Sequence, residues 1–157
     1  MSSGDDAERS ETALPVVIPH AIRAGIIEHA RAELPNEACG LIVGDHPAAN
    51  GGVALRWLPT RNHAASPFRY EIDSDDLLRA TSETDDADEV FWAIVHSHVA
   101  SPARPSPTDI GLAFYPDALY VLVSLHPDAA DATTGEPGIR AWHIVDGQVS
   151  EVAIGAD

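Results

Sequence analysis

Residues 91–110 decide the fold and read Phe-Trp-Ala-Ile-Val-His-Ser-His-Val-Ala-Ser-Pro-Ala-Arg-Pro-Ser-Pro-Thr-Asp-Ile. The first five are apolar and predict a short buried strand that runs directly into His96, Ser97 and His98. Side chains alternate along a strand with a period of two, so both imidazoles point to one side and Ser97 to the other. Two neighbouring imidazoles at a strand end indicate a metal site whose next ligand comes from another element.

A short helix after the proline-rich loop supplies that ligand. Ser106 is a favourable N-cap, Pro107 suits the first helical position, and Asp109 lies in the first turn of a helix that continues over Ile110–Tyr115. Packed beside the strand end, this helix would hold Asp109 near the two histidines. Two nitrogens and one oxygen form the ligand set of a catalytic zinc ion, which keeps its fourth position for water. We therefore expect one Zn²⁺ per chain at these three residues.

Each half of this site also has a simpler interpretation. The run Ser106-x-x-Asp109 resembles a capping box, which needs no metal and which favours Glu or Gln at its last position. A lone His-x-His is common by chance. The spacing favours the metal, because seven residues separate His98 from Ser106 and two separate Ser106 from Asp109. This spacing resembles the signature of the JAB1/MPN/Mov34 metalloenzymes, the JAMM or MPN-plus proteins.

A second segment carries the same resemblance. That family has a glutamate well upstream, and residues 35–44 read Pro-Asn-Glu-Ala-Cys-Gly-Leu-Ile-Val-Gly here. The resemblance implies that Glu37 is the catalytic proton shuttle and that Ser106 donates a hydrogen bond to the developing oxyanion. Asn62 and Ser97 are candidate substrate-binding residues, with a structural role as the alternative for each. Cys39 is interpreted as a small buried hydrophobe.

The resemblance covers about residues 16–153 and points to the short, single-domain bacterial branch, which residues 86–90, 116–124 and 144–147 resemble in particular. Members of that branch act on ubiquitin-like β-grasp sulfur carrier proteins in sulfur metabolism and cysteine biosynthesis. The resemblance thus implies a zinc metallopeptidase that hydrolyses the amide bond after a carrier's C-terminal Gly-Gly and releases a cysteine or other residues. The tail would lie extended by strand addition, and the loop over residues 99–105 could cover it.

Four other functions use similar residues or a similar motif. An isopeptidase that removes ubiquitin-like modifiers from lysines uses the same residues and stays open. A non-catalytic MPN scaffold would have lost ligands, whereas all five functional positions are intact. A cytidine-deaminase site needs Pro-Cys-x-x-Cys, which the single cysteine excludes. DNA-repair-associated bacterial relatives usually carry additional N-terminal helical segments, where this chain has an acidic stretch.

Composition limits the partners. The chain has 25 acidic and 9 basic residues, all nine of them Arg, and a formal net charge of -16. A nucleic-acid binder needs a basic face, so no nucleic-acid partner is expected. No apolar run is long enough to span a bilayer and the N-terminus does not resemble a signal peptide, so we expect a cytoplasmic protein without a membrane partner. The apolar face of the first predicted helix leaves a homodimer open.

The length of 157 residues suits one domain with one core. Residues 1–12 predict a disordered acidic tail, and residues 13–157 predict an α/β domain with a mixed, mostly antiparallel sheet flanked by about three helices. The resemblance implies that this domain has the MPN fold, with a cytidine-deaminase-like layout. The predicted strands are Leu14–Ile18, Ala38–Val43, Val53–Leu58, Phe68–Ile72, Phe91–Val95, Leu119–Leu125, Ile139–Val145 and Gln148–Ile154. The predicted helices are Pro19–Leu34, Asp73–Thr84 and Ser106–Tyr115, with an acidic turn over Glu83–Glu89.

Overall fold

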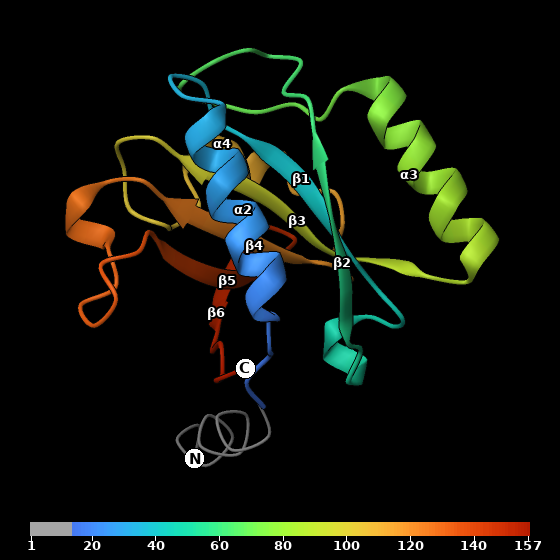
Figure 1. Cartoon of the computed structure of the whole chain (residues 1–157). Coiled ribbons are helices and arrows are strands. Elements are labelled where there is room, and N and C mark those ends of the chain that lie inside the picture. Colours follow the sequence, from blue (N-terminus) through green and yellow to red (C-terminus); the bar gives the residue numbers. More distant parts are fainter. Residues whose placement is uncertain (1–13) are drawn as a thin grey trace.

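The computed structural model describes residues 14–157, which form one α/β domain (Figure 1). The acidic tail predicted for residues 1–12 lies outside the described residues. The helices are α2 (His20–Ala32), α3 (Ser74–Ala87) and α4 (Pro107–Gly111), with short 3-10 turns η1 (Ala48–Asn50) and η2 (Pro127–Ala129). The strands are β1 (Cys39–Gly44), β2 (Ala54–Thr60), β3 (Val90–His98), β4 (Leu119–Ser124), β5 (Gly138–Val145) and β6 (Gln148–Val152).

The six strands form one sheet in the order β2-β1-β3-β4-β5-β6. Only β3 and β4 pair in parallel, and the other four neighbouring pairs are antiparallel. The expected mixed, mostly antiparallel sheet with three helices is therefore confirmed. The antiparallel pairing of β1 with β3 places Cys39 opposite His96, so the beginning of β1 lies beside the histidine end of β3.

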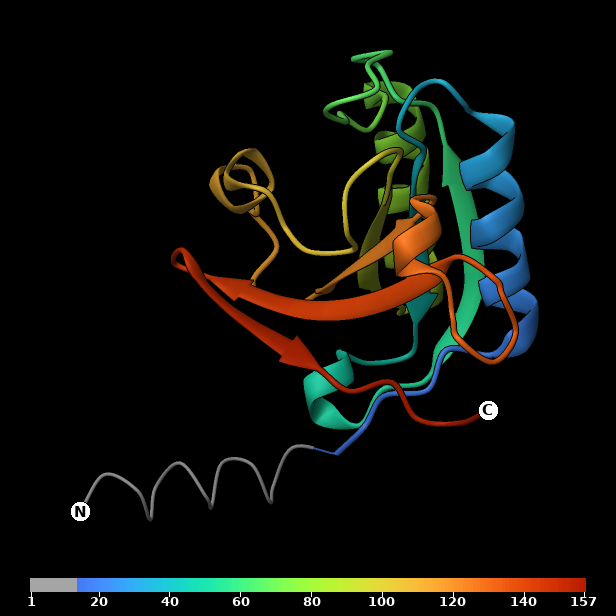
Figure 2. The ribbon, with the colours of Figure 1, turned by 90° about the vertical axis from the view of Figure 1, so that its left-hand side faces the viewer.

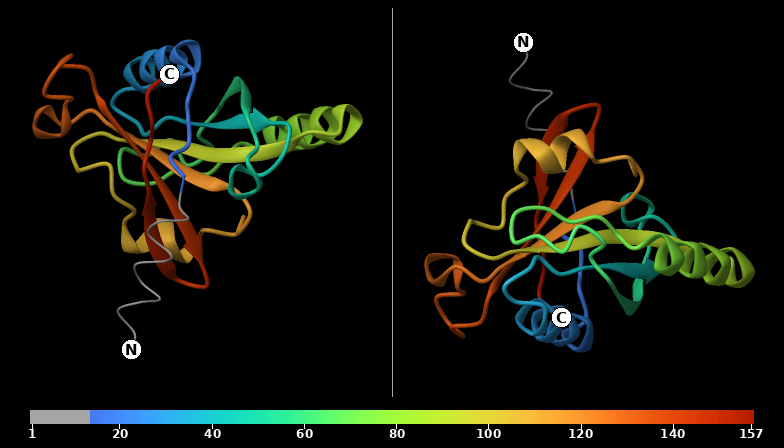
Figure 3. Two further views of the ribbon diagram at one scale, coloured as in Figure 1. Left: turned by 90° about the horizontal axis from the view of Figure 1, so that it is seen from below. Right: turned by 90° about the horizontal axis from the view of Figure 1, so that it is seen from above.

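The helices cover both faces of the sheet (Figures 2 and 3). The apolar side of α2 packs on one face, where its isoleucines contact buried residues of the central strands. Helix α4 and the beginning of α3 cover the other face, around a second cluster that contains Leu41, Ile94 and Trp142. Among residues 14–157, every helix is too short or too polar to traverse a lipid bilayer.

Gly40 explains the Cys-Gly doublet at the beginning of β1. The indole of Trp57 on β2 crosses the sheet directly over this glycine. A Cβ atom at position 40 would lie 2.8 Å from Cζ3 of Trp57 and 2.6 Å from the carbonyl oxygen of Leu58. Because one of these neighbours is main chain, the contact cannot be relieved by a side-chain rotation alone.

Two of the predicted strands are wrong. Over residues 14–18 only a single parallel bridge forms, between Val16 and Ile154. In the segment Phe68–Ile72 only Ile72 makes a bridge, to Asn62. This second segment belongs to a loop that folds back on itself, because the side chain of Asn62 satisfies main-chain groups that a strand would pair with a neighbour.

Two helix boundaries also differ from the prediction. Helix α4 ends at Gly111 rather than near Tyr115, whose N–H instead donates to the hydroxyl of Tyr120 over 3.1 Å. Helix α3 continues to Ala87, so most of the predicted acidic turn is helical. It ends where Asp88 takes a left-handed conformation with φ of 57°. The apolar positions of these segments are too few to define a helix end from periodicity.

We expect Gly40→Ala to destabilise the domain, because overpacking a tight contact typically costs about 1–3 kcal/mol. The free energy of unfolding, measured by urea denaturation, should fall by that amount. Gly111→Ala is the matched control, since a Cβ atom at Gly111 meets nothing within 4 Å. Equal stability of the two variants would contradict the packing role of Gly40.

Candidate metal centre and active site

Three buried side chains meet where β3 ends and α4 begins. Nε2 of His96 lies 3.3 Å from Nε2 of His98, and Oδ2 of Asp109 lies 3.2 and 3.0 Å from these two nitrogens. In a tetrahedral zinc site with bonds of 2.0–2.1 Å, neighbouring ligand atoms are about 3.3 Å apart. The three atoms thus match one face of such a tetrahedron, and the group fits a JAMM zinc site.

The surroundings fix how one imidazole is presented. Nδ1 of His98 lies 2.7 Å from the carbonyl oxygen of Pro102. A carbonyl only accepts, so Nδ1 carries the proton and the neutral ring keeps its Nε2 lone pair for a metal. His96 is held differently: the ring of Tyr70 stacks on it at 4.2 Å, and its Nδ1 has no hydrogen-bond partner among the described residues.

Asp109 serves as helix cap and candidate ligand together. The N–H of Ser106 donates to Oδ2 of Asp109 over 2.9 Å, and the N–H of Asp109 donates to the Ser106 hydroxyl over 3.1 Å. The capping box weighed as an alternative to the metal site is therefore present. It aims the same oxygen at the histidines, so the two interpretations are compatible.

Burial and hydrogen bonding have opposite effects on the pKa values of these three groups. Burial prevails at His96, and hydrogen bonding prevails at His98 and Asp109. Burial dominates for His96 and lowers its pKa, so this ring is neutral near pH 7. For His98, burial opposes the charged form, but its hydrogen bonds to Asp109 and to the Pro102 carbonyl prevail. For Asp109, burial likewise opposes the charged form, but the hydrogen bonds from the His96 and His98 rings prevail. As a result the pKa of His98 is raised and the pKa of Asp109 is held well below its usual range. Asp109 is therefore a carboxylate throughout the physiological range.

Glu37 lies just before β1 and is only 4% exposed. Its N–H donates to the carbonyl oxygen of Ser66 over 2.8 Å, and its own carbonyl accepts from the amide of Asn62 over 3.0 Å. The next N–H, of Ala38, donates to the Ser97 hydroxyl over 2.8 Å. Three bonds thus fix the main chain on both sides of the glutamate.

The carboxyl group of Glu37 is poised to exchange a proton. Burial raises its pKa from 4.5 to about 7, the His98 ring opposes this rise, and the negative charge of Asp109 adds to it. Its Oε1 atom is buried without a hydrogen-bond partner among the described residues. An acid with a pKa near the working pH is suited to both accepting and returning a proton.

The candidate substrate residues make main-chain contacts. Asn62 donates to the carbonyl oxygens of Glu37 and Arg69 and accepts from the N–H groups of Ala64 and Glu71, so all four of its bonds stay inside the protein. Ser97 is 1% exposed and links β1 to β3 through Ala38. These contacts hold the main chain next to Glu37.

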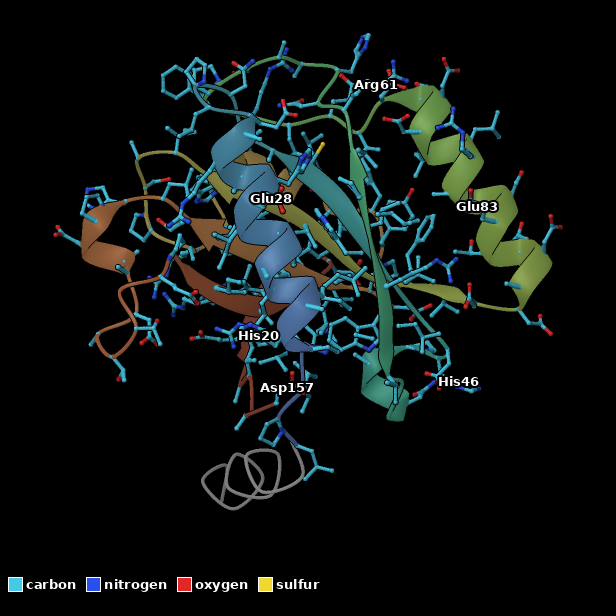
Figure 4. All side chains as sticks on the ribbon, in the orientation of Figure 1. His20, Glu28, His46, Arg61, Glu83 and Asp157 are labelled. Atoms are coloured by element: carbon cyan, nitrogen blue, oxygen red, sulfur yellow. The ribbon has the colours of Figure 1, made fainter. Side chains whose placement is uncertain are left out.

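Sequence reasoning missed several groups around the site. The carbonyl of Pro102 has no sequence signature, because every residue carries one. Tyr70 has no sequence signal beyond its place in the segment Phe68–Ile72, because its stacking on His96 depends on how the loop folds. Cys39 is buried, with its sulfur 3.3 Å from the Thr60 hydroxyl, in agreement with the preferred interpretation. The exposed His46 lies just after β1, beyond the end of that strand opposite Cys39 (Figure 4).

Comparison with known proteins assigns the chain to a family. Residues 19–145 match the family of prokaryotic homologs of the JAB domain. The CysO-cysteine peptidase of Mycobacterium tuberculosis is 40% identical over 147 residues, which cover 91% of this chain and 92% of that protein. The desampylase of Haloferax volcanii is 32% identical over 107 residues, covering 65% and 75% respectively. The chain therefore belongs to the prokaryotic JAB family and is a JAMM-type peptidase.

Solved structures agree with this assignment. The solution structure of protein DSY2949 from Desulfitobacterium hafniense superimposes with a TM-score of 0.75 at 30% identity, covering 90% of this chain and 92% of that one. A crystal structure of a JAB1/MPN domain protein from Archaeoglobus fulgidus shares the fold with a TM-score of 0.51 at 14% identity, covering 91% and 100%. The MPN fold expected from the sequence is confirmed.

We expect Glu37→Gln to raise the free energy of unfolding of the metal-free protein, relative to the parent, by more at pH 8 than at pH 5. Because the folded state raises the pKa of Glu37 to about 7, it binds more protons than the unfolded state between pH 4.5 and 7. The free energy of unfolding therefore falls as pH rises through that window, by up to about 3 kcal/mol. The amide side chain of the Glu37→Gln variant has no proton to lose, so its free energy of unfolding should lack this dependence on pH.

Urea denaturation in a chelator at both pH values measures the effect. Glu28→Gln, an exposed carboxylate on α2, is the control (Figure 4). For Glu28→Gln, the difference in free energy of unfolding from the parent should be the same at both pH values. If the difference for Glu37→Gln is also the same at both pH values, the raised pKa of Glu37 is wrong.

Proposed function

We propose that the protein hydrolyses the amide bond after the C-terminal Gly-Gly of a ubiquitin-like sulfur carrier protein and releases a C-terminal cysteine. The observation that carries the proposal is the buried group of His96, His98 and Asp109 with Glu37 held beside it. The 40% identity to the CysO-cysteine peptidase over nearly the whole length of both chains supports this substrate class.

His96, His98 and Asp109 would hold one zinc ion per chain. Zinc bound there would supply an activated water and would polarise the scissile carbonyl. Glu37 accepts a proton from the attacking water and returns it to the leaving nitrogen as the C–N bond breaks. The burial that raises its pKa to about 7 allows both transfers at neutral pH.

Ser106 has the geometry for a second role. Its oxygen accepts the N–H of Asp109, which leaves the hydroxyl proton free to point outward. We assign that proton to the substrate carbonyl oxygen, where negative charge accumulates as water adds. Removing one donor of this kind typically lowers kcat about 10²- to 10³-fold.

We assign Asn62 and Ser97 to positioning rather than to direct substrate contact, because their polar atoms are occupied by main-chain groups. The remaining sequence predictions concern the setting of the protein. The cytoplasmic location and the homodimer stay predictions.

The test is the intact mass of a carrier ending in Gly-Gly-Cys, before and after incubation with the zinc-loaded enzyme. We expect the loss of one cysteine with the parent protein. Glu37→Ala should retain zinc, measured by elemental analysis, and lose turnover, because only the proton shuttle is gone. His96→Ala should lose both zinc and turnover.

Two outcomes would contradict the proposal. Unchanged cleavage by Glu37→Ala would overturn the role of this glutamate. An intact carrier with zinc stoichiometrically bound would overturn the linear substrate. In that case, cleavage of a carrier joined through Gly-Gly to a lysine side chain would establish the isopeptidase alternative.

Asn62→Ala should lower kcat without releasing zinc. The amide holds the carbonyl of Glu37 and closes its loop, so its loss should misplace the carboxylate and reduce kcat about tenfold or more. Zinc content and the KM for the carrier should stay close to those of the parent. A changed KM with unchanged kcat would instead identify Asn62 as a substrate-binding residue.

A further inference from the structure

Residues 99–105 form the loop between the second and third candidate ligands, and Figure 2 shows its course from the end of β3 towards α4. Hydrogen bonds from side chains of the sheet hold this loop. Three consecutive carbonyls, of residues 101, 102 and 103, accept hydrogen bonds in that order from the Ser124 hydroxyl, the His98 ring and the Trp142 indole. The distances are 2.6, 2.7 and 3.0 Å. A loop held at three successive residues presents the next side chain from a rigid base.

That next side chain is Arg104. It is exposed, and its guanidinium carbon lies 5.9 Å from the centre of the Trp142 indole ring. Arg140 lies over the same indole at 4.7 Å, but both its Nε and Nη2 atoms donate to Glu151 over 2.7 Å. No carboxylate among residues 14–157 lies within ion-pair distance of Arg104. Among the described residues, the guanidinium N–H groups of Arg104 have no carboxylate partner and can bind another anion, although the charge of Arg104 still acts on Glu151 from a distance.

Arg104 differs from half of the arginines that the structure describes, because those are paired with carboxylates. In a chain with 25 acidic residues, several arginines are held by carboxylates of the protein itself. These pairs are Arg56 with Glu89, Arg61 with Asp73 and Asp76, Arg79 with Asp76, and Arg140 with Glu151. Figure 4 shows Arg61 at the beginning of α3. Arg104 is the only arginine in the segment that joins His98 to Asp109.

We propose that Arg104 binds the free α-carboxylate of the residue that is released. This inference rests on the proposed function and identifies which bond the site selects. The centre already contains two acidic side chains, Glu37 and Asp109. A third carboxylate, brought by the substrate, needs a further positive charge to be held there.

The chemistry of the guanidinium fits this ligand. Its planar fork of N–H groups binds a carboxylate through two parallel hydrogen bonds, and the indole face beneath keeps the fork in place. Only a linear C-terminal residue has a carboxylate one residue beyond the scissile bond. Arg104 thereby favours linear tails over lysine conjugates.

The experiment compares two carriers that differ in one group. One ends in Gly-Gly-Cys with a free carboxylate, and the other ends in Gly-Gly-Cys carboxamide. The parent enzyme should cleave the acid with a kcat/KM about 10- to 100-fold higher, as expected for a hydrogen-bonded charge. Arg104→Gln should lose this preference by slowing the acid alone, and Arg104→Lys should restore part of it.

Arg79→Gln is the matched control, because Arg79 is an exposed arginine on α3. It should retain the full preference for the acid. Equal cleavage of acid and amide by the parent enzyme would overturn the role of Arg104 and leave the peptidase function standing. A proportional loss on both carriers in Arg104→Gln would also overturn it. Failure of the parent to cleave either carrier would overturn the proposed function itself.

Discussion

Oδ2 of Asp109 accepts the N–H of Ser106 and lies within 3.2 Å of Nε2 of both His96 and His98. A carboxylate that is only 7% exposed is stable only if its charge is compensated locally. Helix α4 must therefore begin where it does, and its first turn must lie against the end of β3. Three features together bring this oxygen to the two imidazoles. They are the rigid loop before α4, the short helix itself and the parallel pairing of β3 with β4.

The sheet brings the remaining group to the same place. Glu37 and the two histidines are about 60 residues apart in the chain, and antiparallel pairing of β1 with β3 makes them neighbours. Ser97, which faces away from the histidines, joins the two strands through its hydroxyl. Because side chains alternate along the strand, adjacent residues face opposite ways: the histidines contact Asp109, and the serine hydroxyl joins β3 to the main chain beside Glu37.

Much of the site could be predicted from the sequence because its residues carry local signals. A period of two places the imidazoles together, and an N-cap followed by proline places Asp109 in a first turn. The strand predicted over Phe68–Ile72 failed for a physical reason: Asn62 supplies from its side chain the bonds that a neighbouring strand would supply. The hydrogen bonds to the carbonyls of residues 101–103 were also invisible, because a main-chain acceptor is the same for every amino acid. The proposed role of Arg104 in carboxylate binding depends on those bonds, so the sequence alone could not predict it.

The chain enters and leaves the described domain side by side. Val16 pairs with Ile154, and the N–H of His20 donates to the carboxylate of Asp157 over 2.6 Å (Figure 4). Helix α2 then runs about 20 Å from this end towards the end that holds Glu37. Fusion of another protein to residue 14 or to residue 157 therefore leaves the end that holds Glu37 facing solution. The same proximity makes residues 14–157 suitable for circular permutation, with a short linker between residue 157 and residue 14.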